Sequence, residues 1–287
     1  MSDNLRGAVL MSLAMAGFAF EDMFIKLLAG ALPLGQILIM LGLGGAVIFG
    51  LIAHRHGQPL LTPVLLTRAL LLRNFSELIG TLGFVLGFVL ASLATASAIL
   101  QAAPLVVTLG AVLFLGEKVG WRRWSAIAFG FLGVMLILRP GMSGFEPASL
   151  FAVIGVLGLA GRDLATRVIP STISSYQISS WAFATMIPGG TFLLLVMGDA
   201  PVLPDILQTM TIGAALLIGI LAYYALVACM RVGELSFVTP FRYTRMVWAL
   251  IVAMLVFGER PDALTLLGAA IIVGAGLFTL WRETRAT

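Results

Sequence analysis

Residues 78–116 read LIGTLGFVLGFVLASLATASAILQAAPLVVTLGAVLFLG and carry no charged side chain. A helix needs about 20 apolar residues to cross the hydrocarbon core of a bilayer. This stretch is therefore too long for one crossing. It predicts two membrane-spanning helices, with the chain turning back near Ser92.

The composition of the whole chain agrees with that stretch. Of the 287 residues, 60% are apolar and 10% are charged, and the mean hydropathy is +1.09. Soluble domains carry about a quarter charged residues, because their exterior must be wetted. The chain is therefore predicted to be an all-α polytopic membrane protein whose surroundings are the lipid bilayer. Ten crossings of about 20 residues would leave only short loops, which argues against a free-standing catalytic domain.

Hydropathy and turn signals predict ten transmembrane helices. Their expected ranges are 7–28, 34–53, 72–91, 94–115, 121–138, 148–169, 175–197, 208–230, 235–257 and 263–281. Lys and Arg gather on the side of the two termini, and only Lys26, Arg139 and Arg260 fall on the other side. Because basic loops stay in the cytoplasm, both termini are expected to be cytoplasmic in a multi-pass protein of the bacterial inner membrane. The net charge of +4 is assigned to these loops and not to a nucleic-acid partner.

The chain also repeats itself with a period near 141 residues. Three residues recur at that offset, and one tripeptide recurs at an offset of 142. The matches are Asp22 with Asp163, Lys26 with Arg167, Gln36 with Gln177, and Gly116-Glu117-Lys118 with Gly258-Glu259-Arg260.

The period divides the chain into two units, residues 5–140 and 148–283, with five predicted spans each. Five is odd, so the second unit must enter the membrane upside down relative to the first. Inverted repeats are the architecture of alternating-access transporters, whose substrate site lies at the midplane between the halves.

Ionisable side chains inside the predicted spans are candidate functional residues, because burying a charge in lipid is costly. One interpretation is a basic, aromatic-lined cavity for a solute, formed by Arg162, Arg242, Tyr243, Arg245 and Trp248. The alternative is that these arginines pair with Glu77 and Asp163 and hold the halves together.

A second set of charges lies near the ends of spans. Asp22 and Asp163 occupy matched places and are candidates for gating or for carrying a coupling proton. The alternative is a pair of helix-end ion pairs at four-residue spacing, Asp22 with Lys26 and Asp163 with Arg167. Glu259 ends a span at its negative pole, where neighbouring Arg260 is expected to compensate its charge.

Small residues and prolines predict how the spans pack. Glycines at close-packing spacing occur at 83 and 87, at 155, 158 and 161, and at 213 and 219, and are expected to let helices approach closely. Pro104, Pro188 and Pro240 fall within or near the starts of spans and permit kinks.

No catalytic, metal or cofactor site is predicted. The chain has no Walker sequence, so transport must draw on an ion gradient, exchange or downhill flow. An intramembrane enzyme would need a base near Ser76 or Ser97, and no histidine lies in any predicted span. A non-transporting membrane partner or a lipid flippase component stays an alternative from another class.

The chain resembles the EamA family of the drug/metabolite transporter superfamily. The resemblance rests on the five-plus-five layout, on Leu115-Gly116-Glu117, on Phe257-Gly258-Glu259-Arg260-Pro261 and on Pro240-Phe241-Arg242-Tyr243-Thr244-Arg245. It implies transport of a small metabolite, and family members carry amino acids, S-adenosylmethionine, riboflavin, sugars or drugs.

The N-terminal sequence narrows that resemblance. Met15-Ala16-Gly17-Phe18 and Glu21-Asp22-Met23-Phe24-Ile25-Lys26 are most similar to small alphaproteobacterial members, which include riboflavin importers. Riboflavin uptake is therefore the specific expectation. An S-adenosylmethionine transporter and an amino-acid or metabolite exporter stay open, as does a homodimeric assembly.

Overall fold

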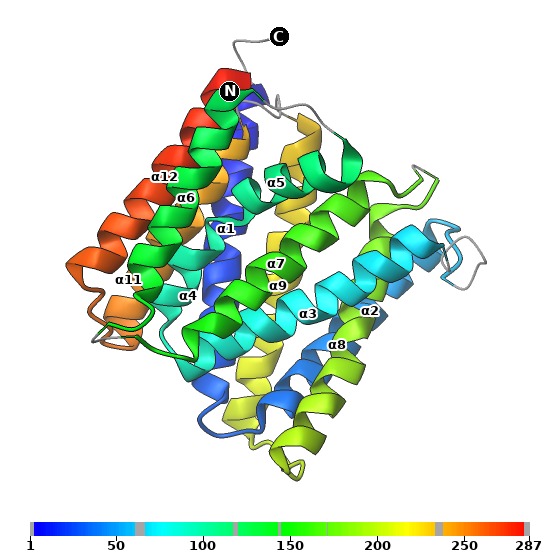
Figure 1. Ribbon diagram of the computed structural model, residues 1–287. Coiled ribbons are helices and arrows are strands. Elements are labelled where there is room, and N and C mark those ends of the chain that lie inside the picture. The colour runs from blue at the N-terminus through cyan, green and yellow to red at the C-terminus, as the bar shows by residue number, and fades with distance from the viewer. Residues whose placement is uncertain are drawn as a thin grey trace.

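The computed structural model describes residues 3–60, 67–116, 120–142, 145–170, 172–232 and 238–283, and these residues are all helices, turns and loops (Figure 1). The first half holds α1 (Asp3–Leu28), α2 (Leu34–Arg55), α3 (Arg68–Leu90), α4 (Leu93–Leu100), α5 (Ala103–Leu115) and α6 (Trp121–Leu138). The second half holds α7 (Ser149–Arg167), α8 (Ser175–Met197), α9 (Ile206–Val232), the short 3-10 helix η2 (Thr239–Tyr243), α11 (Thr244–Val256) and α12 (Ala263–Glu283).

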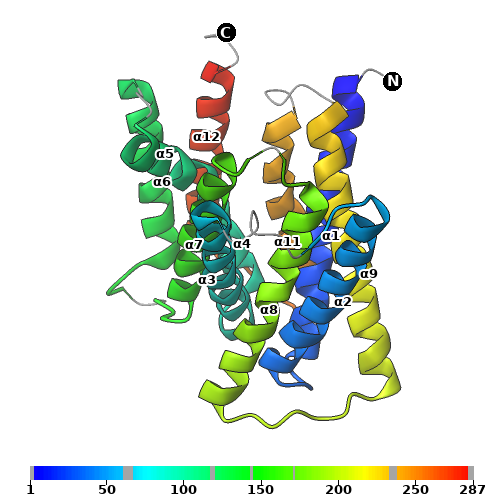
Figure 2. The same ribbon diagram turned by 90° about the vertical axis from the view of Figure 1, so that its right-hand side faces the viewer.

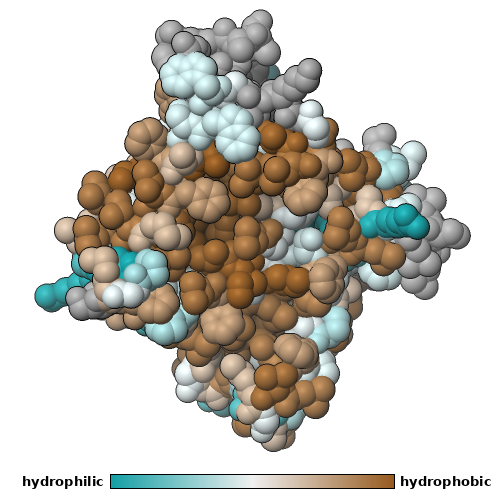
Figure 3. Space-filling model, in the orientation of Figure 1, coloured by the Kyte–Doolittle hydropathy of each residue, from teal (hydrophilic) through white to brown (hydrophobic). Residues whose placement is uncertain are grey.

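The helices are long and apolar enough for a membrane. Among the described residues, seven segments meet the length and hydropathy of a span, and two shorter apolar helices cover Trp124–Leu138 and Ala263–Phe278. Large apolar side chains such as Phe114 and Leu255, each 80% exposed, point outward. The face seen in Figure 3 is accordingly mostly hydrophobic, with hydrophilic residues at its margins. This is the surface that a bilayer covers, because such area would be unfavourable in water.

The two halves pack in matched pairs. In the repeat, α1 corresponds to α7, α3 to α9, and α4 with α5 to the segment that holds η2 and α11. The contact of α1 with α9 therefore matches that of α7 with α3, and the contact of α1 with α11 matches that of α7 with α5. Three further pairs join an element to its own counterpart, namely α2 with α8, α4 with α11 and α6 with α12. The sequence period is therefore also a repeat of structure.

The matched glutamines Gln36 and Gln177 show the same relation at single-residue resolution. Gln36, in the first turn of α2, donates to the backbone carbonyl of Val202 at 2.6 Å and accepts from its N–H at 2.8 Å. Gln177, in the first turn of α8, donates to the carbonyl of Pro59 at 2.7 Å. Each side chain thus holds the loop that follows the other's helix, while α2 and α8 run in opposite directions (Figure 2).

Glycines set the closest contacts between the halves, as predicted for residues 83, 87, 155 and 158. A Cβ added at Gly83 would lie 2.6 Å from the backbone nitrogen of Gly155, across the α3–α7 contact. The expectation fails at Gly213, where an added Cβ would meet nothing within 4 Å. Whether a glycine is needed therefore depends on what packs against it, which the spacing alone does not show.

Candidate functional site

Two segments are interrupted inside the bundle. The predicted span over 94–115 is present as Leu93–Leu115, but it is not one regular helix, because Gln101 and Ala102 separate α4 from α5. The start of the ninth predicted span lies outside the described residues, and η2 then leads directly into α11. Pro104 and Pro240 stand in the first turns of α5 and η2, where a missing N–H leaves no intrahelical bond unmade. Irregular backbone at membrane depth is tolerated where protein buries it or where it lines a cavity.

The two interruptions meet at matched residues. Nε2 of Gln101 donates to the backbone carbonyl of Tyr243 at 3.4 Å, and the two residues are 142 positions apart. In an inverted repeat, a residue contacts its own counterpart only near the pseudo-two-fold axis that relates the two halves. The centre of the candidate site therefore lies where α4, η2 and α11 come together.

Arg245, in the first turn of α11, forms a buried ion pair with Asp22 of α1. Arg245 Nη2 lies 2.7 Å from Asp22 Oδ2, and Asp22 is 6% exposed. The guanidinium also lies over the rings of Phe18 and Phe84, 5.3 and 5.2 Å from their centroids. One side chain thus joins α1, α3 and α11, and no sequence pattern predicted the contacts with the two phenylalanines.

A second charged cluster lies between α3 and α7. Arg162 Nη1 is 3.1 Å from Glu77 Oε1, and Arg162 Nη2 is 2.8 Å from Asp163 Oδ1. Arg73 Nη2 is 2.7 Å from Glu77 Oε2. Two arginines face two carboxylates, so the cluster is neutral and satisfies the requirement that buried charges be paired. It joins the two halves, as in the alternative that assigned these arginines a pairing role.

The expected pair of Asp22 with Lys26 is wrong. Lys26 Nζ instead lies 2.7 Å from Glu259 Oε1, and Asp22 pairs with Arg245. The four-residue spacing makes the local pair possible, but α11 brings a guanidinium and, beyond its end, a carboxylate against the same face of α1.

The expected pair of Asp163 with Arg167 stays a prediction. Asp163 pairs with its neighbour Arg162. The side chain of Arg167 lies outside the described residues.

The three remaining predicted site residues differ in their surroundings. Arg242 is partly buried, and no described acidic side chain pairs with it. Tyr243 is buried, and its hydroxyl lies so close to Gly276 of α12 that any side chain there would clash with it. Trp248 packs against the apolar cluster that includes Met11 and Cys229. Of the three predicted arginines, only Arg242 has no ion pair within the described part of the chain.

Glu259 plays a part that its sequence neighbourhood did not indicate. Its carboxylate receives four bonds, from Lys26 Nζ and Ser92 Oγ at 2.7 Å each and from the N–H groups of Leu93 and Ala94 at 3.0 Å each. We call these five residues the Glu259 cap. Burial by itself would raise the pKa of Glu259, but the bonds from Lys26 and α4 outweigh it and hold that pKa below its ordinary value of 4.5. The expected compensation by Arg260 is replaced by a lysine and a helix N-terminus from the other half of the chain.

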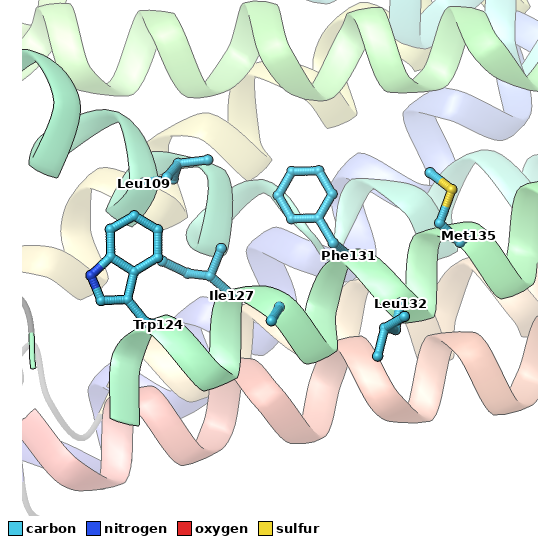
Figure 4. Close-up of a pocket in the computed structure, with 7 residues that line it drawn as sticks. Leu109, Trp124, Ile127, Phe131, Leu132 and Met135 are labelled. Atoms are coloured by element: carbon cyan, nitrogen blue, oxygen red, sulfur yellow. The ribbon is translucent and has the colours of Figure 1, made fainter. Parts of the chain in front are cut away.

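Two pockets can be described, and neither is lined by the predicted arginines. A pocket of about 510 Å³ lies on α5 and α6, among Leu109, Trp124, Phe131 and other apolar side chains (Figure 4). A pocket of about 310 Å³ is polar and lies beside the Glu259 cap, with Thr95 and Arg139 in its lining. The predicted central cavity stays a prediction, and the interrupted helices are packed together in this state.

The comparisons with known proteins place the chain in a family. The model of the EamA-like transporter family matches it twice, over residues 5–139 and 147–281. The chain therefore belongs to the EamA-like transporter family, within the drug/metabolite transporter superfamily, and the resemblance drawn from its motifs is confirmed. It is a multi-pass protein of the bacterial inner membrane.

Individual relatives cover most of the chain. A riboflavin transporter of Rhizobium johnstonii is 31% identical over 210 residues, which are 72% of this chain and 68% of that protein. An S-adenosylmethionine uptake transporter of Rickettsia bellii is 30% identical over 220 residues, 75% of this chain and 73% of that one. The pseudopaline exporter CntI of Pseudomonas aeruginosa is 27% identical over 289 residues, 95% of both chains. A solved crystal structure, 15% identical, covers 99% of this chain and 98% of its own with a TM-score of 0.59, which shows a shared fold.

Proposed function

We propose that this chain is a secondary transporter that moves a small polar, ring-bearing metabolite across the inner membrane by alternating access, with riboflavin uptake as the specific activity. In this proposal residues 5–140 and 148–283 form two inverted units of five spans each, ten in all, and both termini are cytoplasmic. The two units rock against each other around the point where their interrupted helices meet. The likeness to the riboflavin transporter of Rhizobium johnstonii supports the choice of solute.

The observation that carries the proposal is the guanidinium of Arg242, which pairs with no acidic side chain in the described part of the chain and lies beside the meeting point of α4, η2 and α11. Arginine offers five N–H donors and no acceptor. It therefore suits a solute with carbonyl, carboxylate or ring-nitrogen acceptors, which flavins and S-adenosylmethionine both carry. Arg162 and Arg245 act in this scheme as paired charges that hold the halves in one state, together with Glu77, Asp163 and Asp22. Tyr243 and Trp248 shape the walls of the site by packing.

S-adenosylmethionine uptake is the second candidate, because relatives with that name also match about three quarters of the chain. Export of an amino acid or metabolite is the third, supported by the likeness to CntI over nearly the whole chain. These candidates share the fold and differ only in the solute and direction.

A binding screen on the purified protein distinguishes them. Thermal unfolding would be followed with riboflavin, S-adenosylmethionine and single amino acids, because a ligand that binds only the folded state raises the unfolding midpoint. A rise with riboflavin alone, followed by riboflavin uptake into liposomes that hold only this protein, is the expected result. A rise with S-adenosylmethionine or amino acids alone contradicts the choice of riboflavin. Failure of the protein alone to transport any bound ligand would favour a non-transporting partner or a flippase component.

A further inference from the structure

The Glu259 cap joins parts of the chain that otherwise barely meet. Lys26 lies near the end of α1 and Ser92, Leu93 and Ala94 lie at the start of α4, both in the first half, whereas Glu259 follows α11 in the second half. α1 and α4 share almost no direct contact. The carboxylate of Glu259 thus ties α1 and α4 to each other and to the segment that follows α11, at the end of the bundle where Arg139 and Asp262 also join the two halves.

The cap also controls the hydration of a helix end. The first N–H groups of any helix have no partner inside the helix. In α4, Ser92 Oγ accepts from the N–H of Thr95 at 3.1 Å, and Glu259 accepts from those of Leu93 and Ala94. If Glu259 withdraws, Leu93 and Ala94 keep satisfied donors only when water replaces the carboxylate. Opening of this end and entry of water are therefore one event.

The surroundings of the cap make that event feasible. Glu259 and Lys26 side chains are 15% and 14% exposed, so the pair is sheltered yet not sealed. The polar pocket of about 310 Å³ adjoins Glu259 and Ser92 and is large enough to admit water beside the carboxylate. If the Glu259 cap were fully buried, water could not reach the carboxylate in this way.

We propose that Glu259 is the gating residue at this end of the transporter: the bundle is closed here while its carboxylate caps α4, and opens when the carboxylate leaves. The inference rests on the proposed alternating access, and the distribution of Lys and Arg makes this the external end. Glu259 is a positioning residue, because it acts by placing α4 against the second half and needs no contact with the solute.

The test measures accessibility at both ends without any solute. Ser97 lies further along α4 than the Glu259 cap, is 1% exposed, and its hydroxyl has no described partner. Ser97→Cys is therefore a reporter behind the cap that costs no hydrogen bond. Ser76→Cys, about 14 residues before the end of α3, is the reporter on the opposite side. A membrane-impermeant maleimide is added from each side, and protein with only the buried Cys229 gives the background.

Glu259→Gln keeps the shape of the side chain but removes the charge that the cap requires. We expect Ser97→Cys to react at least 10-fold faster from the external side in this variant, and Ser76→Cys to react more slowly from the cytoplasmic side. Opposite changes at the two reporters are what a shift between two states produces, whereas a loosened scaffold exposes both. Asp262→Asn is the matched control, because Asp262 pairs with Arg139 at the same end, 2.5 Å away, and makes no bond to α4. Its labelling rates should stay within about twofold of the parent.

Unchanged labelling of Ser97→Cys in folded Glu259→Gln protein, or faster labelling at both reporters, overturns the proposal. If that variant does not fold, Ser92→Ala removes one of the four bonds to Glu259, together with the bond from the N–H of Thr95, and should shift both reporters in the same directions by a smaller factor. Unchanged labelling there has the same meaning. A failed ligand screen would refute the choice of solute without changing these rates, so the two failures are distinguishable.

Discussion

At the scale of single residues, the buried charges fall into committed and uncommitted groups. Arg245 and Arg162 are each bound by carboxylates from another helix, and Lys26 is bound by Glu259. Arg242 has no acidic partner among the described residues. The same residue type therefore plays two roles here, and only the packing tells them apart.

Arg242 and Arg245 should respond differently to loss of charge. Arg242→Met is expected to reduce transport of the bound solute at least 10-fold while leaving thermal stability nearly unchanged, because no described ion pair is broken. Arg245→Met should cost about 3–5 kcal/mol of stability, because it leaves Asp22 buried and unpaired. Asp22→Asn combined with Arg245→Met should recover part of that loss. Equal loss of stability in the Arg242 and Arg245 variants would contradict this assignment.

The Glu259 cap predicts a definite pH dependence. A carboxyl whose pKa in the folded state lies below its ordinary value stabilises the fold above that ordinary value and stops doing so as the pH falls through the lower folded value. Thermal unfolding of the parent should therefore be independent of this group above about pH 5 and lose its contribution below pH 4.5. Glu259→Gln lacks the group, so the difference in unfolding midpoint between the two proteins should shrink with acidification. A constant difference down to pH 3 would show that the charge of Glu259 contributes nothing.

At the scale of elements, close backbone crossings and interrupted helices organise the bundle. α3 and α7 cross with glycine against glycine, and α6 and α12 do the same, since a Cβ at Gly133 would lie 2.7 Å from the carbonyl of Gly268. The proline inside α8, Pro188, leaves that helix continuous over its whole length, whereas Pro104 coincides with a break. A proline by itself therefore does not interrupt a helix in this chain: the break before Pro104 includes the non-helical residues Gln101 and Ala102, and Pro188 has no such residues before it.

The α3–α7 crossing gives a matched pair of substitutions. Gly83→Ala forces a methyl group against the backbone of Gly155 and should destabilise the protein by about 1–3 kcal/mol, as overpacking does. Gly213→Ala places the same methyl group where nothing lies within 4 Å, and it should be neutral or slightly stabilising because alanine favours the helix. Thermal unfolding in detergent measures both. A Gly213→Ala protein as unstable as Gly83→Ala would show that the close backbone crossing does not decide the effect, because helix propensity alone favours alanine at both positions.

At the scale of the whole molecule, both termini lie at the same end of the bundle (Figures 1 and 2). An even number of crossings would produce that arrangement, and the distribution of Lys and Arg predicts that this end is cytoplasmic. In the proposed orientation the Glu259 cap lies at the opposite, external end. The direction in which the protein opens thus depends on its orientation.

Reporter fusions test that orientation. Green fluorescent protein fused after residue 287 should fluoresce, because it folds in the cytoplasm, and alkaline phosphatase at the same place should be inactive. Phosphatase fused after Asp199, in the loop between α8 and α9, should be active. The reverse pattern would place the Glu259 cap on the cytoplasmic side and exchange the two sides in the labelling experiment.

The amino-acid sequence by itself determined the membrane class, the places of most helices, the repeat and the family, because hydropathy and period are properties of the chain read along one dimension. The turn near Ser92 and the correspondence of Gln36 with Gln177 follow from it directly, whereas the loop contacts of the two glutamines are visible only in the structure. Tertiary structure alone decided which charges meet. Asp22 and Lys26 stand four residues apart and could have bound each other, yet α11 offers each a partner from across the bundle. Ion pairing depends on distances between helices that are far apart in the chain, and in a low-dielectric interior even a few ångströms decide which partner is bound.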